Sequence, residues 1–396
     1  MLIKDKQCLK NLITDLSNFI REEKTELFAL NRKITLDTDH WITEDYQTVV
    51  LYLKNYIKNH VHTEIIDKIK PKGKVLIILS YNEPLVLSII PVLNALIVGN
   101  DVVLKTSRNN EDFVRFVWQK SGLAEKYGLK LEVVSLKTPD EISDFIKKVR
   151  AVYFFGSYRV AQVIAKTCGE NYIEFYPEIE TSDSKVFNKK SSHIKNDACL
   201  TLEESFTHSG QICQRIQGVF VQNKLFDEYV KILKKEFMEL CQSVNLNKFI
   251  TDDYSLARSE MLGSLFFDIE KSRPNEIVRV KDLPLLVISP KQTSDFVKNA
   301  YFLPVLWISS FDSKEELIKI LNSRRFFLGI NIQSDKSTFT DYIINNTKFT
   351  RYTVNTSHTN IRSQEGWGGS WPSGYSGYRN WIEHFSDGYV IINDFK

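Results

Sequence analysis

Several features that define other protein classes are missing from this chain of 396 residues. No apolar run approaches the roughly 18 residues that a membrane-spanning helix needs, so we expect no membrane span. Charged residues make up 26% of the chain and leave a formal net charge of +3. No basic block with interleaved aromatic residues occurs. This near balance of charge argues against nucleic acid or an anionic membrane as a partner.

The cysteines follow neither a disulfide nor a metal-binding pattern. Their number, five, is odd, and no CxxC occurs. No His/Cys spacing suits zinc, so we expect neither a disulfide framework nor a metal site. The stretch MLIKDKQCLKNLITDL has the pattern of an amphipathic helix and not of a signal peptide. We therefore expect a cytoplasmic protein in a reducing compartment.

The sequence also lacks repeats and long low-complexity tracts; what it contains instead is a regular alternation of two patterns. Apolar residues at spacings of three and four in LKNLITDLSNFI and YQTVVLYLKNYI predict helices. From residue 73, strand-like apolar runs such as GKVLIILS (73–80) and DVVLK (101–105) alternate with helical patterns. This alternation predicts an α/β fold with a doubly wound parallel sheet, which binds ligands at the carboxyl ends of its strands.

The alternation resumes after about residue 190 with different segment lengths, which indicates a second α/β domain. We expect N-terminal helices over 1–72, a dinucleotide-binding domain over 73–189, a catalytic domain over 190–374 and a C-terminal tail over 375–396.

Cys213 stands out within HSGQICQ (208–214), on polar ground between two helix-like segments. A thiol needs nearby N–H dipoles, a cation or a base to become a reactive thiolate. Ser209, Gly210 and Gln211 can form a tight turn that points backbone N–H groups at the sulfur, and such donors can also hold an oxyanion. The alternative is a buried cysteine that only fills space.

Six further stretches, together with HSGQICQ, give a family resemblance that spans about residues 73–380. In order they are SYNEPL (80–85), GNDVVLKTS (99–107), FFGS (154–157), EIETSDSKVF (178–187), FLPVLWISSFDSKEELI (302–318) and GGSWPSGYSGY (368–378). Taken together they resemble the motifs of the aldehyde dehydrogenase superfamily. The short chain and helical front are most similar to its class 3, fatty-aldehyde branch. The resemblance implies a Rossmann-type cofactor domain beside an α/β catalytic domain.

The resemblance also implies roles for three residues. Cys213 would attack an aldehyde carbon and form a thiohemiacetal. The Asn82 amide and the Cys213 backbone N–H would hold the oxyanion, and Glu178 would activate the water that hydrolyses the thioester. Glu178 lies 35 residues before Cys213. Glu174 competes with Glu178 for the role of base, because strand ends admit register errors.

The expected cofactor is NAD or NADP, although no GxGxxG motif occurs. By the resemblance, Lys105 would bond the adenine ribose, and Gly156 and Ser157 would open a helix whose N-terminus favours pyrophosphate. Arg108 takes the place of a glutamate that engages the ribose hydroxyls in many NAD-preferring relatives. A guanidinium there could pair with a 2′-phosphate, which favours acceptance of NADP, or could point to solvent.

The sequence departs from the family pattern at several positions. Ala300 replaces the glutamate that holds the nicotinamide ribose, which implies looser cofactor binding. Glu83 is an acid within the asparagine motif, where the family has an apolar residue. Glu180 and Thr181 stand where the family has two glycines after the general base. Ala161 and Leu303 replace glycines of two further motifs.

Three functions are therefore open. The first is oxidation of a small-molecule aldehyde to a carboxylate, the second an acyl-CoA or acyl-thioester reductase, and the third a catalytically silent scaffold or subunit. The resemblance implies a homodimer, for which the strand-like YVIIND (389–394) could pair across subunits. Aromatic residues near the end either line an apolar entrance or only pack the tail: Trp367, Trp371, Tyr375, Tyr378 and Trp381.

Overall fold

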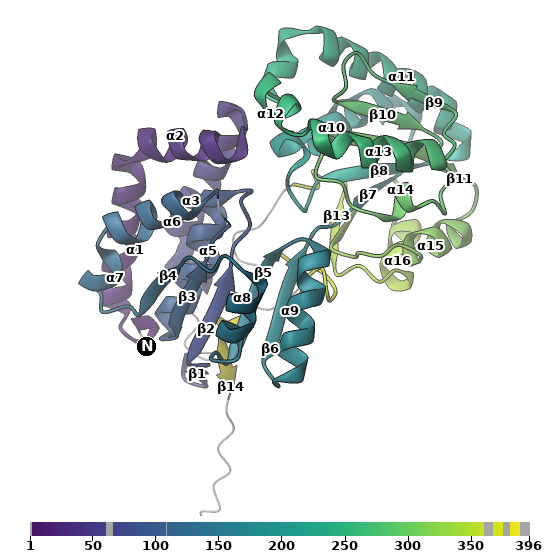
Figure 1. Ribbon diagram of the computed structural model, residues 1–396. Helices are drawn as coiled ribbons and strands as arrows, with labels where there is room; N and C mark the ends of the chain where they lie inside the picture. The colour runs from purple at the N-terminus through teal and green to yellow at the C-terminus, as the bar shows by residue number, and fades with distance from the viewer. Residues whose placement is uncertain (1, 61–65, 108, 360–366, 375–380, 389–396) are drawn as a thin grey trace, which may run out of the picture.

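The structure, a computed structural model, describes residues 2–60, 66–107, 109–359, 367–374 and 381–388. Two large sheets dominate it, and helices cover both faces of each sheet (Figure 1). The α/β class and the pair of α/β sheets expected from the sequence are confirmed. The two sheets lie in separate halves of the molecule, so a site can form where the halves meet.

Three helices begin the chain, as their apolar spacing predicted. They are α1 Lys6–Glu22, α2 Lys24–Thr35 and α3 Asp39–His60. In α1 the buried residues recur at spacings of three and four: Leu9, Leu12, Ile13, Leu16 and Ile20. This stripe joins the core formed with α5 and one face of the first sheet.

The first sheet has five parallel strands in the order β4-β3-β2-β5-β6. They are β2 Lys74–Ile78, β3 Asp101–Lys105, β4 Leu131–Val134, β5 Ala151–Gly156 and β6 Glu174–Ile179. The connecting segments are α5 Pro84–Val98, α6 Glu111–Arg115, the π-helical turn η2 Phe116–Lys120, α7 Leu123–Lys126, α8 Pro139–Ile146 and α9 Tyr158–Glu170. The strand order reverses between β2 and β5, and such a reversal opens a ligand-binding crevice at the carboxyl ends of the strands.

Helix α5 shows how local sequence sets the boundaries of an element. Pro84 stands in the first turn, where its missing N–H costs nothing, and Gly99 ends the helix with φ +99°. All 15 residues of α5 are buried. Even so, no helix among the described residues combines the length and apolarity needed to cross a membrane.

The second sheet has seven strands in the order β13-β12-β7-β8-β11-β10-β9, all parallel except β9. The strands are β7 Asp183–Asn188, β8 Ile216–Gln222, β9 Glu276–Val278, β10 Leu285–Ile288, β11 Val305–Phe311, β12 Gly329–Ser334 and β13 Arg351–Val354. Helices α10 Ile194–Phe206 and α11 Asn223–Gln242 pack on one face. The other face carries α13 Ser259–Lys271, α14 Asp295–Lys298, α15 Lys314–Asn322 and α16 Ser337–Asn346, while α12 Asp252–Ala257 lies nearby.

Strand β7 corrects the expected boundary after residue 189. It pairs with β8 and β12 and not with the first sheet. The change of sheet therefore falls between Ile179, the end of β6, and Asp183, the start of β7. Both segments read as buried strands, and only their pairing partners decide to which sheet each belongs.

A small antiparallel pair returns the end of the described chain to the first half. Strand β14 Ser386–Gly388 follows α17 Trp381–His384 and pairs with β1 Ile69–Pro71. The segment YVIIND (389–394), to which we assigned a possible role in dimerisation, lies outside the described residues.

Candidate active site

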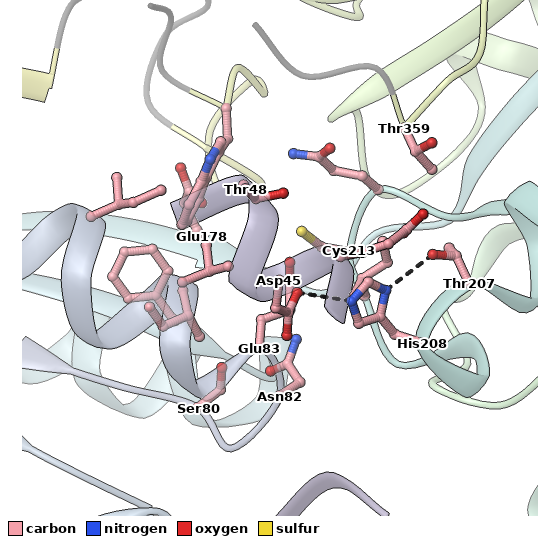
Figure 2. A pocket seen from close by; sticks show the side chains of 18 of the residues that line it. Asp45, Thr48, Ser80, Asn82, Glu83, Glu178, Thr207, His208, Cys213 and Thr359 are labelled. Carbon is pink, nitrogen blue, oxygen red and sulfur yellow. Dashed lines mark hydrogen bonds and ion pairs between the residues drawn. The ribbon is translucent and has the colours of Figure 1, made fainter. Parts of the chain in front are cut away.

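A cavity of about 390 Å³ lies between the two halves of the molecule. Its wall combines α3, α5, the carboxyl ends of β2, β5 and β6, and the segment that contains Cys213. Figure 2 shows labelled side chains from both halves facing this space, with Asn82 and Glu178 from the first and Cys213 and His208 from the second. The cavity brings together all three residues expected to carry out the chemistry: Cys213, Asn82 and Glu178.

The segment before Cys213 is held in an unusual backbone conformation. In the short 3-10 helix η4 Thr207–Gly210, His208, Ser209 and Gly210 have φ values of +50°, +55° and +79°. A Cβ atom added to Gly210 would lie 2.5 Å from the carbonyl carbon of Leu303. Glycine at position 210 therefore allows this segment to pack directly against the backbone of another.

Buried hydrogen bonds anchor the same segment to the N-terminal helices. The Ser209 hydroxyl donates to Asp37 Oδ1 at 2.8 Å, and Gln211 Nε2 donates to the carbonyl of Thr35 at 3.0 Å. These bonds connect residues more than 170 positions apart. They fix the approach to Cys213 from the side of α2.

Cys213 itself is partly accessible from the cavity. The Thr181 hydroxyl donates to its backbone carbonyl. Among the described residues, no acceptor receives the Cys213 backbone N–H, which leaves it available to a ligand. Burial raises the pKa of the Cys213 thiol well above its usual value, and the carboxylates of Glu83 and Glu178 raise it further. The thiol is thus neutral at rest and needs a base to react.

Asn82 lies in the loop between β2 and α5, directly before the first turn of that helix. Its Nδ2 donates to the Gln211 carbonyl at 3.1 Å. Gln211 precedes Cys213 by two positions, so this bond holds the Asn82 amide close to the cysteine segment. The second N–H of the amide is left for another acceptor.

Glu178 and its competitor Glu174 lie near opposite ends of β6. Glu178 lines the cavity. Burial, and to a smaller extent the charge of Glu83, raises the pKa of Glu178 well above its usual value. Glu174 makes ion pairs of 2.6 Å with both Lys72 and Arg150 and does not line the cavity. The contacts therefore place Glu178, and not Glu174, with Cys213.

The expected cofactor residues lie at the carboxyl end of the first sheet. Lys105 ends β3, and Gly156 ends β5 and lines the cavity. Ser157 precedes α9 and its hydroxyl accepts the Val160 N–H at 3.4 Å, so the N-terminus of a 13-residue helix faces this crevice. Arg108, on which the leaning towards NADP depended, lies outside the described residues.

The departures from the family pattern have structural consequences. Thr181, in place of a glycine, supports the Cys213 carbonyl as described above, and Glu180 lines the cavity. Ala161 and Leu303 are buried, at 3% and 1% exposure, and Ala300 packs beside the core of the first half. These side chains are accommodated in the fold.

An acid–histidine cluster in the cavity was not expected from the sequence. His208 Nε2 lies 2.9 Å from Asp45 Oδ1, and its Nδ1 lies 3.0 Å from the Thr207 hydroxyl. One donor atom each from Asp45, Glu83 and His208 lie within 4.8 Å of one another. Burial alone would lower the pKa of His208, but the carboxylates of Asp45, Asp37 and Glu83 raise it to about 10. His208 and Glu83 stood in the quoted motifs, whereas nothing in the sequence singled out Asp45.

The aromatic residues near the end of the chain divide between the two expected roles. Trp367 and Trp381 line the cavity, and their ring centroids lie 5.0 Å apart. Trp371 is 65% exposed and lies outside the lining. Tyr375 and Tyr378 lie outside the described residues.

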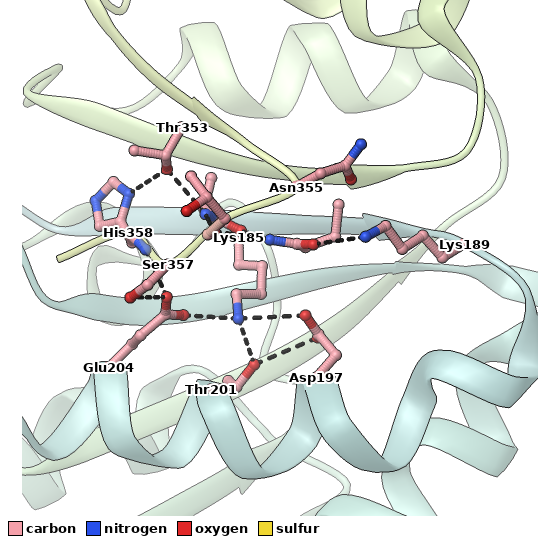
Figure 3. A network of polar contacts seen from close by, with 12 residues as sticks. Lys185, Lys189, Asp197, Thr201, Glu204, Thr353, Asn355, Ser357 and His358 are labelled. Atoms are coloured by element: carbon pink, nitrogen blue, oxygen red, sulfur yellow. Dashed lines mark hydrogen bonds and ion pairs between the residues drawn. The ribbon is translucent and has the colours of Figure 1, made fainter. Parts of the chain in front are cut away.

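A buried polar network surrounds Lys185 in the second half (Figure 3). Lys185 Nζ lies 2.7 Å from Glu204 Oε2 and 2.8 Å from the Thr201 hydroxyl. Glu204 Oε1 in turn accepts the Ser357 hydroxyl at 2.9 Å and the His358 N–H at 2.5 Å. The next residue, Thr359, lines the cavity, so the network fixes part of its wall.

Comparison with known proteins identifies the family of this arrangement. A model of the aldehyde dehydrogenase family matches residues 7–248 and 282–392. The chain is 23% identical over 358 residues to 4,4'-diaponeurosporen-aldehyde dehydrogenase of Staphylococcus aureus. The aligned residues cover 86% of this chain and 74% of that relative. It is 23% identical over 290 residues to aldehyde dehydrogenase family 3 comG of Dictyostelium discoideum, covering 70% of the chain and 60% of that relative.

Solved structures share the fold at low identity. A salicylaldehyde dehydrogenase from Pseudomonas putida G7 superposes with a TM-score of 0.80 and 18% identity, over 98% of this chain and 86% of the other. Glyceraldehyde-3-phosphate dehydrogenase GapN of Methanocaldococcus jannaschii, complexed with NADP, gives a TM-score of 0.79 and 19% identity over 96% and 88%.

Proposed function

The chain belongs to the aldehyde dehydrogenase family, and on that premise we propose that it oxidises an aldehyde to a carboxylate with NAD or NADP as acceptor. One observation carries the proposal: Cys213, Asn82 and Glu178 line a single cavity at the carboxyl end of the first sheet. A nucleophile, an oxyanion donor and a general base are the groups that this reaction requires.

The reaction begins at Cys213. A base in the cavity takes the proton of the Cys213 thiol, the resulting thiolate sulfur attacks the aldehyde carbon, and the C=O electron pair moves to oxygen to give a thiohemiacetal oxyanion. The second N–H of the Asn82 amide and the free backbone N–H of Cys213 stabilise this oxyanion. Each such donor contributes about 100-fold or more to the rate in comparable acyl-transfer sites.

When bound, the dinucleotide supplies the hydride acceptor. Loss of hydride from the former aldehyde carbon restores the C=O bond and leaves a thioester on Cys213. Ionised Glu178 then takes a proton from water, the water oxygen attacks the thioester carbon, and the C–S bond breaks to release the carboxylic acid. The balance is one aldehyde, one water and one NAD or NADP converted to a carboxylate, the reduced dinucleotide and two protons.

The crevice of the first sheet has residues that suit a dinucleotide. Lys105 would hold the adenine ribose, and Gly156 and Ser157 would present the N-terminus of α9 to the pyrophosphate. Glu180 lines the cavity together with Gly156. In the family motif, the position of Glu180 is a glycine. We expect the Glu180 side chain to loosen the fit of the nicotinamide end.

The assembly and compartment belong to the same proposal. We expect a homodimer in the cytoplasm, on the basis of the family and of five cysteines that are all unpaired. Light scattering of the purified protein would give a mass near 92 kDa for a dimer, about twice the 46.0 kDa of one chain.

A burst experiment tests the chemistry. The wild type should form reduced dinucleotide continuously with butanal, and Cys213→Ala should form none. Glu178→Gln should give a single burst close to one equivalent and then stop, because the thioester forms but is not hydrolysed. A Glu178→Gln variant with full steady-state turnover would contradict the base, and such turnover only in the presence of coenzyme A, whose thiol takes the acyl group, would favour an acyl-CoA reductase. Failure of the wild type to bind either dinucleotide at millimolar concentration would favour a catalytically silent scaffold.

A further inference from the structure

The cavity around Cys213 is acidic on one side. Five carboxyl side chains line it: Glu44, Asp45, Glu83, Glu178 and Glu180. The described residues of the lining include no lysine or arginine, and His208 is already paired with Asp45. An excess of carboxyl groups in a partly enclosed space attracts cations and repels anions.

Glu83 is the carboxyl group best placed to meet a substrate. It follows Asn82 in the chain and its charge acts on both Cys213 and Glu178, so it lies close to the reacting groups. Among the described residues, no donor makes a hydrogen bond to its carboxylate. Figure 2 shows Glu83 beside Asp45 and Asn82, below the Cys213 sulfur.

A second group in the same wall also lacks a hydrogen-bond donor. Gln214, the residue after Cys213, lines the cavity and is only 4% exposed. Its buried Oε1 accepts no hydrogen bond from any described residue. A buried carbonyl oxygen without a donor is costly, so a ligand that supplies an N–H would be favoured here.

Part of the remaining wall between α3 and α5 is apolar, although Gln47 and Thr48 of α3 also line it. Tyr52 and Leu51 come from α3, and Leu87 and Ile90 come from α5. Such a surface suits a short methylene chain, whereas the acceptors Glu83 and Gln214 suit a charged donor at its end. The two kinds of surface meet beside the nucleophile.

We propose, resting on the oxidation of aldehydes set out above, that the substrate is an aldehyde that carries an ammonium group, held by Glu83 with Gln214 as a second acceptor. The ammonium ion supplies three N–H donors and a positive charge, which match an ionised carboxylate and an unpaired carbonyl oxygen. The asparagine motif of the family has an apolar residue where this chain has Glu83, so the acid gives this cavity a charge preference of its own.

The protonation of Glu83 is consistent with this assignment. Burial and the charges of Asp45 and Asp37, opposed by the charge of His208, together raise the pKa of Glu83 to about 7. The carboxyl group is therefore about half ionised near neutral pH. A bound ammonium ion would stabilise the ionised form.

The test compares 3-aminopropanal with butanal, which has a methyl group in place of the ammonium. We expect kcat/KM to be at least tenfold higher for 3-aminopropanal, as a hydrogen bond between charged groups is worth about 10- to 100-fold. Glu83→Gln, which keeps the shape and removes the charge, should abolish most of this preference. Glu228→Gln is the matched control, because it makes the same charge change on the exposed side of α11, outside the cavity.

Calorimetry with propylammonium chloride separates this inference from the proposed oxidation. Binding by the wild type that Glu83→Gln loses and Glu228→Gln keeps would support the cation site, even if neither aldehyde were oxidised. Efficient oxidation of butanal with no preference for 3-aminopropanal would overturn the inference and leave the oxidation standing. Tight binding of Zn²⁺ but not of propylammonium, lost in Glu83→Gln, would overturn it in favour of a metal at Asp45, Glu83 and His208.

Discussion

Replacement of Lys185 by methionine should destabilise the second sheet strongly. Lys185 is fully buried in β7, and its ammonium contacts Glu204 at 2.7 Å, Thr201 at 2.8 Å and Asp197 at 3.4 Å. Both acids are also buried, at 1% and 7% exposure. Methionine fills a similar volume, so the substitution removes the charge and leaves little empty space.

The size of the effect follows from the charges left behind. After the substitution, two buried carboxylates face each other without a cation, and removal of one partner from a buried ion pair costs about 3–5 kcal/mol. The hydrogen bonds that Glu204 accepts from Ser357 and His358 remain, as does the one that Asp197 accepts from the Tyr229 hydroxyl. These bonds keep the loss within that range.

Urea unfolding followed by tryptophan fluorescence measures the loss, because Trp307 lies fully buried in β11 of the same sheet. Lys189→Met is the matched control. Lys189 follows β7 directly, and its Nζ donates only to Gln333 among the described residues, at 3.0 Å (Figure 3). We expect the control to lose less than about 1 kcal/mol.

A double substitution tests the electrostatic reasoning directly. Adding Glu204→Gln to Lys185→Met removes one of the uncompensated charges while keeping the acceptor for Ser357 and His358. We expect the double variant to recover about 1–3 kcal/mol. A Lys185→Met loss below about 1 kcal/mol, or no recovery in the double variant, would refute the claim that the charges stabilise this core.

Two further predictions concern the cavity. In Glu83→Gln, the acid limb of the pH profile of kcat/KM for butanal should move to lower pH, because the charge of Glu83 raises the pKa of both Glu178 and Cys213; a limb that stays or moves to higher pH would contradict this. Gly210→Ala should lower the stability by about 1–3 kcal/mol and the activity by about 100-fold, since its Cβ would meet backbone at 2.5 Å and φ is +79°. Thermal melting and steady-state rates check this against Gly263→Ala, an exposed position inside α13 with nothing within 4 Å, which should keep the wild-type activity and gain up to about 1 kcal/mol in stability.

Local pattern was enough to predict most elements of both sheets. Continuous apolar runs marked β2 and β3, and the apolar spacing marked α1 and α3, because a buried face needs a fixed period. Pro84 and Gly99 mark the two ends of α5 for the same kind of reason. Each of these signals depends on the residue's own backbone and its near neighbours.

Two decisions needed the tertiary structure. Glu174 and Glu178 stand four positions apart on β6, so alternation gives both the same face and cannot choose between them. Their surroundings choose: Lys72 and Arg150 hold one, and the cavity receives the other. The sheet to which β7 belongs was likewise set by its pairing with β8 and β12.

The sequence by itself determined the family and the order of its motifs, and it singled out Cys213 as the candidate nucleophile, because those motifs are short and each encodes its own turn or strand end. The acidic cluster was decided only in three dimensions. Asp45 and His208 are 163 positions apart, and their 2.9 Å contact depends on how α3 packs against the segment that precedes Cys213. The residues next to Asp45 and those next to His208 in the sequence do not predict this contact. A buried charge pair follows from the packing of whole helices and not from spacing along the chain.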